Sequence, residues 1–260
     1  MNAKLLKENL KKNKLLFGSW QSLVDNGITH LLTAKNFEFL AIDMEHSSIN
    51  IEQAKQIIQS CHNNSKPCLP RPSSNCNDLL KPLLDAGSDG IIIPMVESLQ
   101  QVDEIVSNVK YPPIGNRSYG INAAQGYGLK ADEYFKKWND DSVIIVQVES
   151  KAGADNIETI LKNDHIDAVM VGPYDLSGSF GVPGNFENPE VILAIKKIIK
   201  ACKENHVSVG TQLSKFTMET FLSNQSLGYN FFFVESDIFT LLNFSHEKNQ
   251  LLEEILKSGS

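Results

Sequence analysis

Eight short apolar segments recur along the chain, and a longer stretch of mixed polar and apolar residues separates each from the next. Most of these segments lack the alternation expected of a strand with one face in water. Continuous apolar runs of this kind are typical of parallel strands that are covered on both faces. The eight predicted strands are residues 15–20, 37–43, 67–72, 90–96, 142–149, 167–173, 207–213 and 230–236.

The stretches between the predicted strands carry apolar residues three and four positions apart, which is the spacing of one helix face. Residues 51–61, 98–109 and 189–205 are the clearest examples. Strands and helices that alternate in this way over 260 residues predict a (β/α)8 TIM barrel. No G-x-G-x-x-G follows the first strand, so a dinucleotide-binding sheet is disfavoured. We expect one barrel domain over residues 1–260.

Composition and charge exclude several classes of partner. The net charge is −7 and the lysines are spread along the chain, so we expect no nucleic acid partner. No apolar run approaches the ~20 residues of a membrane helix. The N-terminal residues carry positive charge but no apolar core of a secretory signal, so we expect a protein that is not exported. The four cysteines show no C-x-x-C spacing, which fits free thiols in a reducing compartment. We therefore expect a cytoplasmic protein without a membrane partner.

Two segments depart from the regular alternation. Residues 110–130 are rich in Gly, Pro and Asn, and a loop of this length inside a domain is usually functional or disordered. We expect it to cover the barrel mouth or to meet a neighbouring subunit. The last predicted helix, residues 238–257, is long for the closing helix of a barrel and carries enough apolar residues to pack beyond its own barrel.

The predicted strands end in polar residues. Barrel enzymes build their active sites at the carboxyl ends of the strands, so these positions are the candidates. They are Asp43-Met44-Glu45-His46 after the second strand, Arg71 after the third, Gln147-Val148-Glu149 at the fifth, Gly172-Pro173-Tyr174-Asp175 after the sixth, and Gln212 at the seventh.

Glu149 and Asp175 end neighbouring strands, and carboxylate oxygens suit magnesium or manganese. Two protein ligands leave most of an octahedral shell open for water and a chelating 2-keto acid. Such a cation acts as a Lewis acid on an enolate. The backbone amides of residues 172–175 lie where a helix begins, which favours a substrate carboxylate there.

Around this metal site the other polar residues have complementary chemistry. His46 is the natural base, because an imidazole exchanges its proton near neutral pH, and Asp43 lies three residues before it. Arg71, between two prolines, is a fixed cation for an enolate or a carboxylate. Gln147 shares a strand face with Glu149. No lysine ends a strand, so a Schiff-base mechanism is disfavoured.

Each residue also has a structural alternative. Asp175 has the position of a helix cap. His46 would also suit a loop histidine that is bonded to Asp43, and Arg71 a salt bridge that closes the barrel.

Five motifs in order, D-M-E-H, P-R-P, P-M-V-E, Q-V-E-S and G-P-Y-D-L-S, make residues 17–234 resemble the HpcH/HpaI aldolase family. Its members are metal-dependent class II aldolases that cleave 2-keto-4-hydroxy acids to pyruvate and an aldehyde. Tyr174 stands where alanine is common in the family, and the loop at 116–128 is more similar to members that act on deoxy-keto sugar acids. A 2-keto-3-deoxy sugar acid is therefore the expected substrate.

The resemblance also implies roles for individual residues. His46 is the general base and Asp85 enhances its basicity, although Asp85 also suits a plain helix-end charge. Arg71 stabilises the transition state, and Glu149 and Asp175 bind Mg²⁺, Mn²⁺ or Co²⁺. The implied substrate-binding residues are Arg71, Gln147, Gly172, Pro173, Tyr174 and Leu213.

The family further implies a hexamer, a trimer of dimers, in which the C-terminal helices are exchanged between neighbours. Two other functions remain open. An acyl-CoA lyase of the citrate lyase β type shares the barrel and the two carboxylates, and a non-catalytic barrel would bind a keto acid without turnover.

Overall fold

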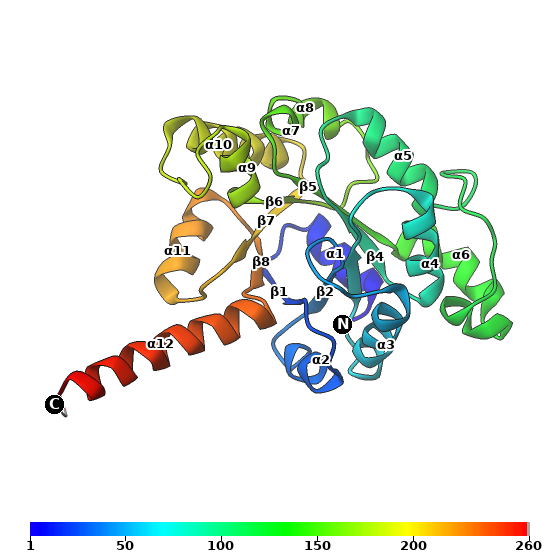
Figure 1. The fold of residues 1–260 in the computed structure, drawn as a ribbon. Helices are drawn as coiled ribbons and strands as arrows, with labels where there is room; N and C mark the ends of the chain where they lie inside the picture. The colour runs from blue at the N-terminus through cyan, green and yellow to red at the C-terminus, as the bar shows by residue number, and fades with distance from the viewer. Residues whose placement is uncertain (259–260) are drawn as a thin grey trace.

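Eight parallel strands form a nearly closed barrel in the computed structural model, which describes residues 1–258 (Figure 1). The hydrogen-bonded order is β3-β2-β1-β8-β7-β6-β5-β4, and β3 lies beside β4 to complete the circle. The strands are β1 (Leu16–Gln21), β2 (Phe39–Asp43), β3 (Cys68–Arg71), β4 (Gly90–Ile93), β5 (Val143–Val148), β6 (Ala168–Val171), β7 (Ser208–Leu213) and β8 (Phe231–Val234). The predicted TIM barrel is confirmed.

Helices surround the barrel in the expected alternation. They are α1 (Ala3–Lys11), α2 (Asn26–Leu32), α3 (Ile51–Asn63), α4 (Asn77–Ala86), α5 (Leu99–Val109), the 3-10 helix η1 (Ala123–Gly128), α6 (Ala131–Asp141), α7 (Lys151–Asp155), α8 (Ile157–Ile160), α9 (Pro173–Ser179), α10 (Pro189–Glu204), α11 (Met218–Leu227) and α12 (Asp237–Ser258).

Two apolar cores lie on the two faces of the barrel wall. The inner core fills the barrel with side chains such as Phe231 and Phe233, and the outer core lies between strands and helices. Gly210 makes room in the inner core, because a Cβ there would lie 2.4 Å from the Phe231 ring. The barrel is thus a packed core, and only its rim is open to substrate.

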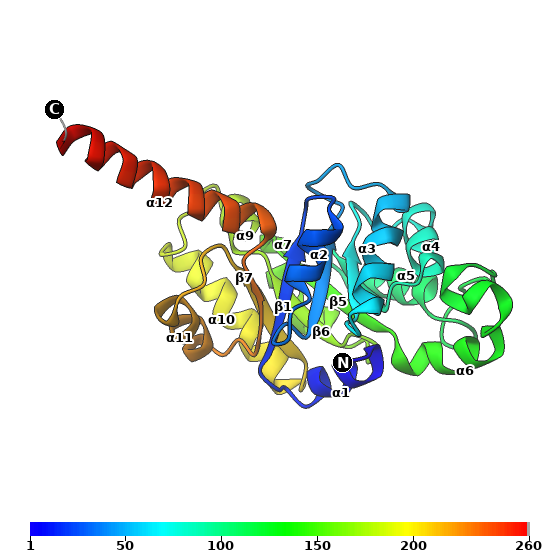
Figure 2. The ribbon, with the colours of Figure 1, turned by 90° about the horizontal axis from the view of Figure 1, so that it is seen from below.

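Helix α1, which the strand pattern did not predict, closes the amino-terminal end of the barrel (Figure 2). Leu6 and Leu10 insert fully buried into the inner core. Lys7 on the same helix forms a buried ion pair with Asp167 at 2.8 Å and donates to the backbone oxygen of Ser142. The sealed end is therefore held by both apolar and charged contacts, which leaves the opposite rim as the entrance.

Lys110 lies fully buried at this sealed end and should make stability depend on pH. Burial, with the nearby charge of Lys7, lowers the pKa of Lys110 to about 7, whereas an unfolded lysine titrates near about 10.4. Between these values the unfolded chain binds more protons, so the free energy of unfolding should rise as pH rises. We expect urea midpoints of the wild type to increase from pH 7 to pH 9.5 relative to those of Lys110→Met.

Lys136→Met removes an exposed lysine nearby and is the matched control, expected to follow the wild type. Parallel pH profiles for the wild type and Lys110→Met would contradict the expectation.

Helix α12 leaves the barrel and projects away from it in both views (Figures 1 and 2). Of its described residues only Asp237 is buried, where its carboxylate accepts the backbone N–H groups of Ser22 and Leu23. Large apolar side chains of the helix are exposed, including Leu241, Phe244 and Ile255. Its predicted length is confirmed. No helix within residues 1–258 is long and apolar enough to cross a membrane.

The loop at 110–130 does not cover the barrel mouth, which corrects one expectation. It packs beside α4 and α6 on the outside of the barrel, and none of its residues lines the cavity at the rim. The buried guanidinium of Arg117 anchors it, 4.8 Å from the Tyr111 ring and 4.6 Å from the Trp138 ring. Cation–π contacts and the ion pair with Asp85 therefore hold this segment in place, although its composition is typical of a mobile loop.

Candidate active site

The parallel register brings the polar strand ends together at one rim. Asp43 pairs with Arg71 across β2 and β3, and Gln147 pairs with Met170 across β5 and β6. Asp43, Arg71, Gln147 and Glu149 are all buried although they are polar or charged. Buried charges persist when they are paired, so their mutual contacts decide whether this is a built site.

Arg71 contacts four neighbouring side chains. Its Nη2 donates to Asp43 Oδ1 at 2.9 Å, and its Nη1 lies 3.3 Å from Gln147 Oε1 and 3.2 Å from Glu45 Oε2. The guanidinium carbon lies 4.6 Å from the centre of the Trp20 ring. The predicted structural ion pair is therefore present, and it also fixes a cation at the barrel mouth.

Asp43 orders the turn that carries His46. Its Oδ1 accepts the backbone N–H groups of Glu45 and His46, each at 3.1 Å, in addition to Arg71. The imidazole itself is 65% exposed, and its Nε2 lies 3.7 Å from Glu45 Oε2. His46 is thus anchored by its backbone, and its ring is left accessible at the rim.

Glu149 lies buried beneath the rim. The Met95 N–H donates to its Oε1 at 2.9 Å, and the side-chain amide of Gln147 donates to its other oxygen. Burial, with the negative charges of Glu45 and Asp175, raises the pKa of Glu149 to about 7. Gly172 allows this packing, because a Cβ there would lie 2.5 Å from Glu149 Oε2.

Asp175 and Tyr174 lie on the exposed first turn of α9, across the rim from His46. Tyr174 is 63% exposed, and its ring contacts Phe186 edge to face. The charge of Asp175 helps to raise the pKa of Glu45 and of Glu149, although burial is the larger cause for both. Three carboxylates therefore share one small region, with Arg71 as the cation beside them.

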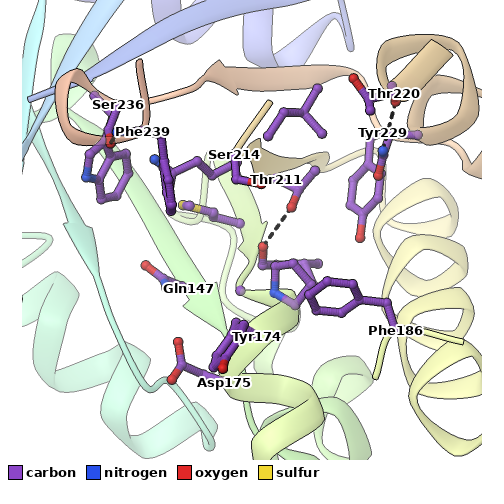
Figure 3. Close-up of a pocket in the computed structure, with 18 of the residues that line it drawn as sticks. Gln147, Tyr174, Asp175, Phe186, Thr211, Ser214, Thr220, Tyr229, Ser236 and Phe239 are labelled. Atoms are coloured by element: carbon purple, nitrogen blue, oxygen red, sulfur yellow. Dashed lines mark hydrogen bonds between the residues drawn. The ribbon is translucent and has the colours of Figure 1, made fainter. Parts of the chain in front are cut away.

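A cavity of about 870 Å³ opens at this rim (Figure 3). Nine of the predicted site residues line it, namely Asp43, His46, Arg71, Gln147, Gly172, Pro173, Tyr174, Asp175 and Leu213. Glu149 lies just below the cavity wall and is 3% exposed. Within residues 1–258 no cluster of three or more His, Cys, Asp or Glu residues has metal-site geometry, so a cation here would take fewer protein ligands.

Asp85 is the predicted site residue that the chain does not bring to the rim. It lies in the last turn of α4, which runs from the end of β3 to the start of β4, and so it lies toward the sealed end. Its carboxylate pairs with Arg117 Nη2 at 2.8 Å, and no contact joins it to His46 within residues 1–258.

Three contributors to the site had no assigned role in the sequence. Glu45 stood in the D-M-E-H motif, and only the fold shows that its carboxylate meets Arg71. Trp20, at the end of β1, carried no signal beyond its place in an apolar run. Met95, which follows Pro94, contributes through its backbone. Its φ of 53° is left-handed, and its N–H donates to Glu149.

Comparison with known proteins identifies the family of the chain. The sequence model of the HpcH/HpaI aldolase/citrate lyase family matches residues 17–229. The chain belongs to this family. The match covers every strand except β8 and the first residue of β1, and it includes all the predicted site residues that line the cavity.

Curated relatives and solved structures agree with the family. The 2-keto-3-deoxy-L-rhamnonate aldolase of Salmonella paratyphi A is 30% identical over 257 residues, with 97% of this chain and 94% of that protein covered. The Salmonella typhimurium protein of the same name is 31% identical over 247 residues, with 93% and 91% covered. A family member from Burkholderia cenocepacia is 27% identical, with a TM-score of 0.89 and 96% and 99% covered. The predicted family and its lyase class, as an aldolase, are confirmed.

Proposed function

We propose that the chain is a divalent-metal-dependent aldolase that reversibly cleaves a 2-keto-4-hydroxy acid to pyruvate and an aldehyde. A 2-keto-3-deoxy sugar acid is the substrate class, in line with the named relatives. One observation carries the proposal. The buried row Asp43, Arg71, Gln147 and Glu149 is fully linked by hydrogen bonds and lies beside an accessible imidazole.

The donor set at Glu149 and Asp175 fits a hard divalent cation. Burial, with the negative charges of Glu45 and Asp175, raises the pKa of Glu149 to about 7. The three carboxylates have Arg71 as the cation beside them, so they carry more negative charge than Arg71 offsets. Within residues 1–258 the buried Oε2 of Glu45 makes no hydrogen bond, although it lies 3.2 Å from Arg71 Nη1. Glu149 and Asp175 would hold Mg²⁺, Mn²⁺ or Co²⁺, and the bound cation would supply Lewis-acid stabilisation of the enolate oxygen.

The residues of the chain divide the remaining chemistry. His46 takes the proton from the C4 hydroxyl, the C3–C4 bond breaks, and its electron pair becomes that of the pyruvate enolate while C4 becomes the aldehyde carbon. Arg71 stabilises the enolate charge, and Gln147 orients the keto acid. The backbone around Gly172, Pro173 and Tyr174 binds the carboxylate, and Leu213 contacts the aldehyde half. A proton delivered to C3 completes pyruvate.

Assembly is part of the proposal. The exposed apolar residues of α12 suit an exchange of C-terminal helices in a hexamer, a trimer of dimers, in the cytoplasm. Asp85 lies away from the rim of its own barrel, so it would enhance the basicity of His46 from a neighbouring copy. Residues 1–258 would then act as one catalytic barrel that is completed by its neighbours.

The test is release of pyruvate from 2-keto-3-deoxy-L-rhamnonate in the presence of Mn²⁺, measured with a lactate dehydrogenase coupled assay. We expect one pyruvate for each aldehyde, loss of activity in EDTA, and recovery when Mn²⁺ is restored. Full activity in EDTA would overturn the metal requirement. Cleavage of citryl-CoA without cleavage of any keto-hydroxy acid would instead favour the acyl-CoA lyase.

A further inference from the structure

The ends of β1, β7 and β8 form one continuous part of the rim. In the hydrogen-bonded order these strands lie together between β2, which leads to His46, and β6, which leads to Asp175. The groups proposed to bind and activate the keto acid follow β2, β3, β5 and β6. With its keto acid held there and its C4 hydroxyl at His46, a substrate extends its remaining carbons toward β1, β7 and β8.

Four uncharged polar side chains line the cavity on this part of the rim, and we call them the polar arc. They are Ser22 after β1, Gln212 and Ser214 at the end of β7, and Ser236 after β8. Strand residues two apart share a face. Ser22 therefore continues the inward face of β1 that Trp20 occupies. Gln212 and Ser214 continue that of β7, which Gly210 occupies beside the inner core. The polar arc thus faces the interior of the cavity.

Ser236 supplies a buried hydroxyl with an unused hydrogen. The residue is 4% exposed, and its Oγ accepts the backbone N–H of Phe239 at 3.1 Å. Within residues 1–258 the hydroxyl hydrogen of Ser236 has no acceptor. Buried polar groups normally have hydrogen-bond partners, so a spare donor in the cavity wall is open to an acceptor on a ligand.

The other members of the polar arc also have unused hydrogen-bonding atoms. In the described part of the chain, the hydroxyl groups of Ser22 and Ser214 make no hydrogen bond. Gln212 uses only its amide nitrogen, which donates to the backbone oxygen of Glu235 at 3.4 Å. The arc therefore offers hydroxyl groups, which both donate and accept, together with a free amide oxygen.

This neutral lining suits the hydroxyl groups of a ligand better than a carboxylate. Lys215, which also lines the cavity here, is exposed, so water screens its charge. In Figure 3 Ser214 and Ser236 lie above Gln147, whereas Tyr174 and Asp175 lie below it. The proposed metal site and the polar arc are therefore on opposite sides of a cavity of about 870 Å³, which has room for a hydroxylated chain between them.

We propose that the polar arc binds the hydroxyl groups on the aldehyde half of the substrate, beyond C4, and so selects hydroxylated over unsubstituted aldehydes. The proposal rests on the aldolase function above and names the residues that would recognise its sugar-acid substrate class. An aldehyde without hydroxyl groups would leave these polar atoms unpartnered, which is the physical basis of the selection.

The test compares propanal with 2,3-dihydroxypropanal, which has the same number of carbons, in the addition of pyruvate with Mn²⁺. For the wild type we expect kcat/KM to be at least about tenfold higher for the dihydroxylated aldehyde. Ser22→Ala, Ser214→Ala and Ser236→Ala should each lower this ratio by about two- to tenfold, the loss of one hydrogen bond. The intrinsic reactivity of each aldehyde is the same for every variant, and a partly unfolded variant loses both activities equally, so the ratio reports on recognition of the hydroxyl groups.

Ser226→Ala is the matched control, because Ser226 is exposed on α11 and does not line the cavity. It should keep the wild-type ratio. Equal kcat/KM for the two aldehydes in the wild type, or an unchanged ratio in all three variants of the arc, would overturn the polar arc as a subsite. Faster turnover of succinic semialdehyde than of 2,3-dihydroxypropanal would also overturn it, since a carboxylate would then be preferred. Absence of an adduct with every aldehyde would instead overturn the aldolase function itself.

Discussion

Glu149→Gln is expected to lower kcat/KM by on the order of 10³-fold, since a cation bound at this site contributes several kcal/mol of transition-state stabilisation. The amide removes the charge of one of the two proposed metal ligands but keeps the size of the side chain. Its oxygen can still accept the Met95 N–H that holds Glu149 Oε1 at 2.9 Å. The loss should therefore appear in Mn²⁺ affinity, measured by calorimetry without substrate, as well as in turnover.

Glu187→Gln makes the same chemical change in an exposed residue that also lines the cavity, and it should have a much smaller effect. If Glu149→Gln binds Mn²⁺ as tightly as the wild type does, Glu149 is not a metal ligand.

His46→Ala is expected to reduce kcat by about 10²- to 10⁴-fold, the range for loss of a general base. The side chain is 65% exposed, so its removal should cost little stability. Pyruvate affinity should be retained, because the groups proposed to bind the keto acid, Arg71, Gln147 and the start of α9, are unchanged. Turnover is followed by the coupled pyruvate assay, and pyruvate binding by calorimetry.

His30→Ala removes an exposed histidine on α2 and serves as the control with wild-type turnover. A His46→Ala variant with full turnover would support the alternative that His46 only orders its loop beside Asp43.

Much of the rim could be predicted, because a strand end is marked in the sequence by an apolar run that stops at a charged residue. Arg71 and Glu149 were found in this way, and the register confirms that their strands present them at one rim. Asp85 could not be placed by the same rule. It lies on a helix, where position along the chain says little about which end of the barrel is reached.

Other features depend on contacts that no local pattern records. Residues 110–130 have the composition of a mobile loop, but Arg117 contacts side chains that lie up to 32 positions away from it along the chain, such as Asp85. In helix α1 only Leu6 and Leu10 are fully buried leucines, which is a weak sequence signal for a packed helix. Its role in closing the barrel becomes clear only when it is seen against the amino-terminal end of the strands.

Gly172 sets a boundary for any attempt to redesign this catalyst. Even a methyl group at this position would overlap the carboxylate of Glu149, with 2.5 Å between the added carbon and Oε2. Positions around the cavity therefore differ in how far they can be varied to change which aldehydes are accepted. Libraries can vary Leu213 on the cavity wall, whereas position 172 accepts only glycine and should be left out of any randomised set.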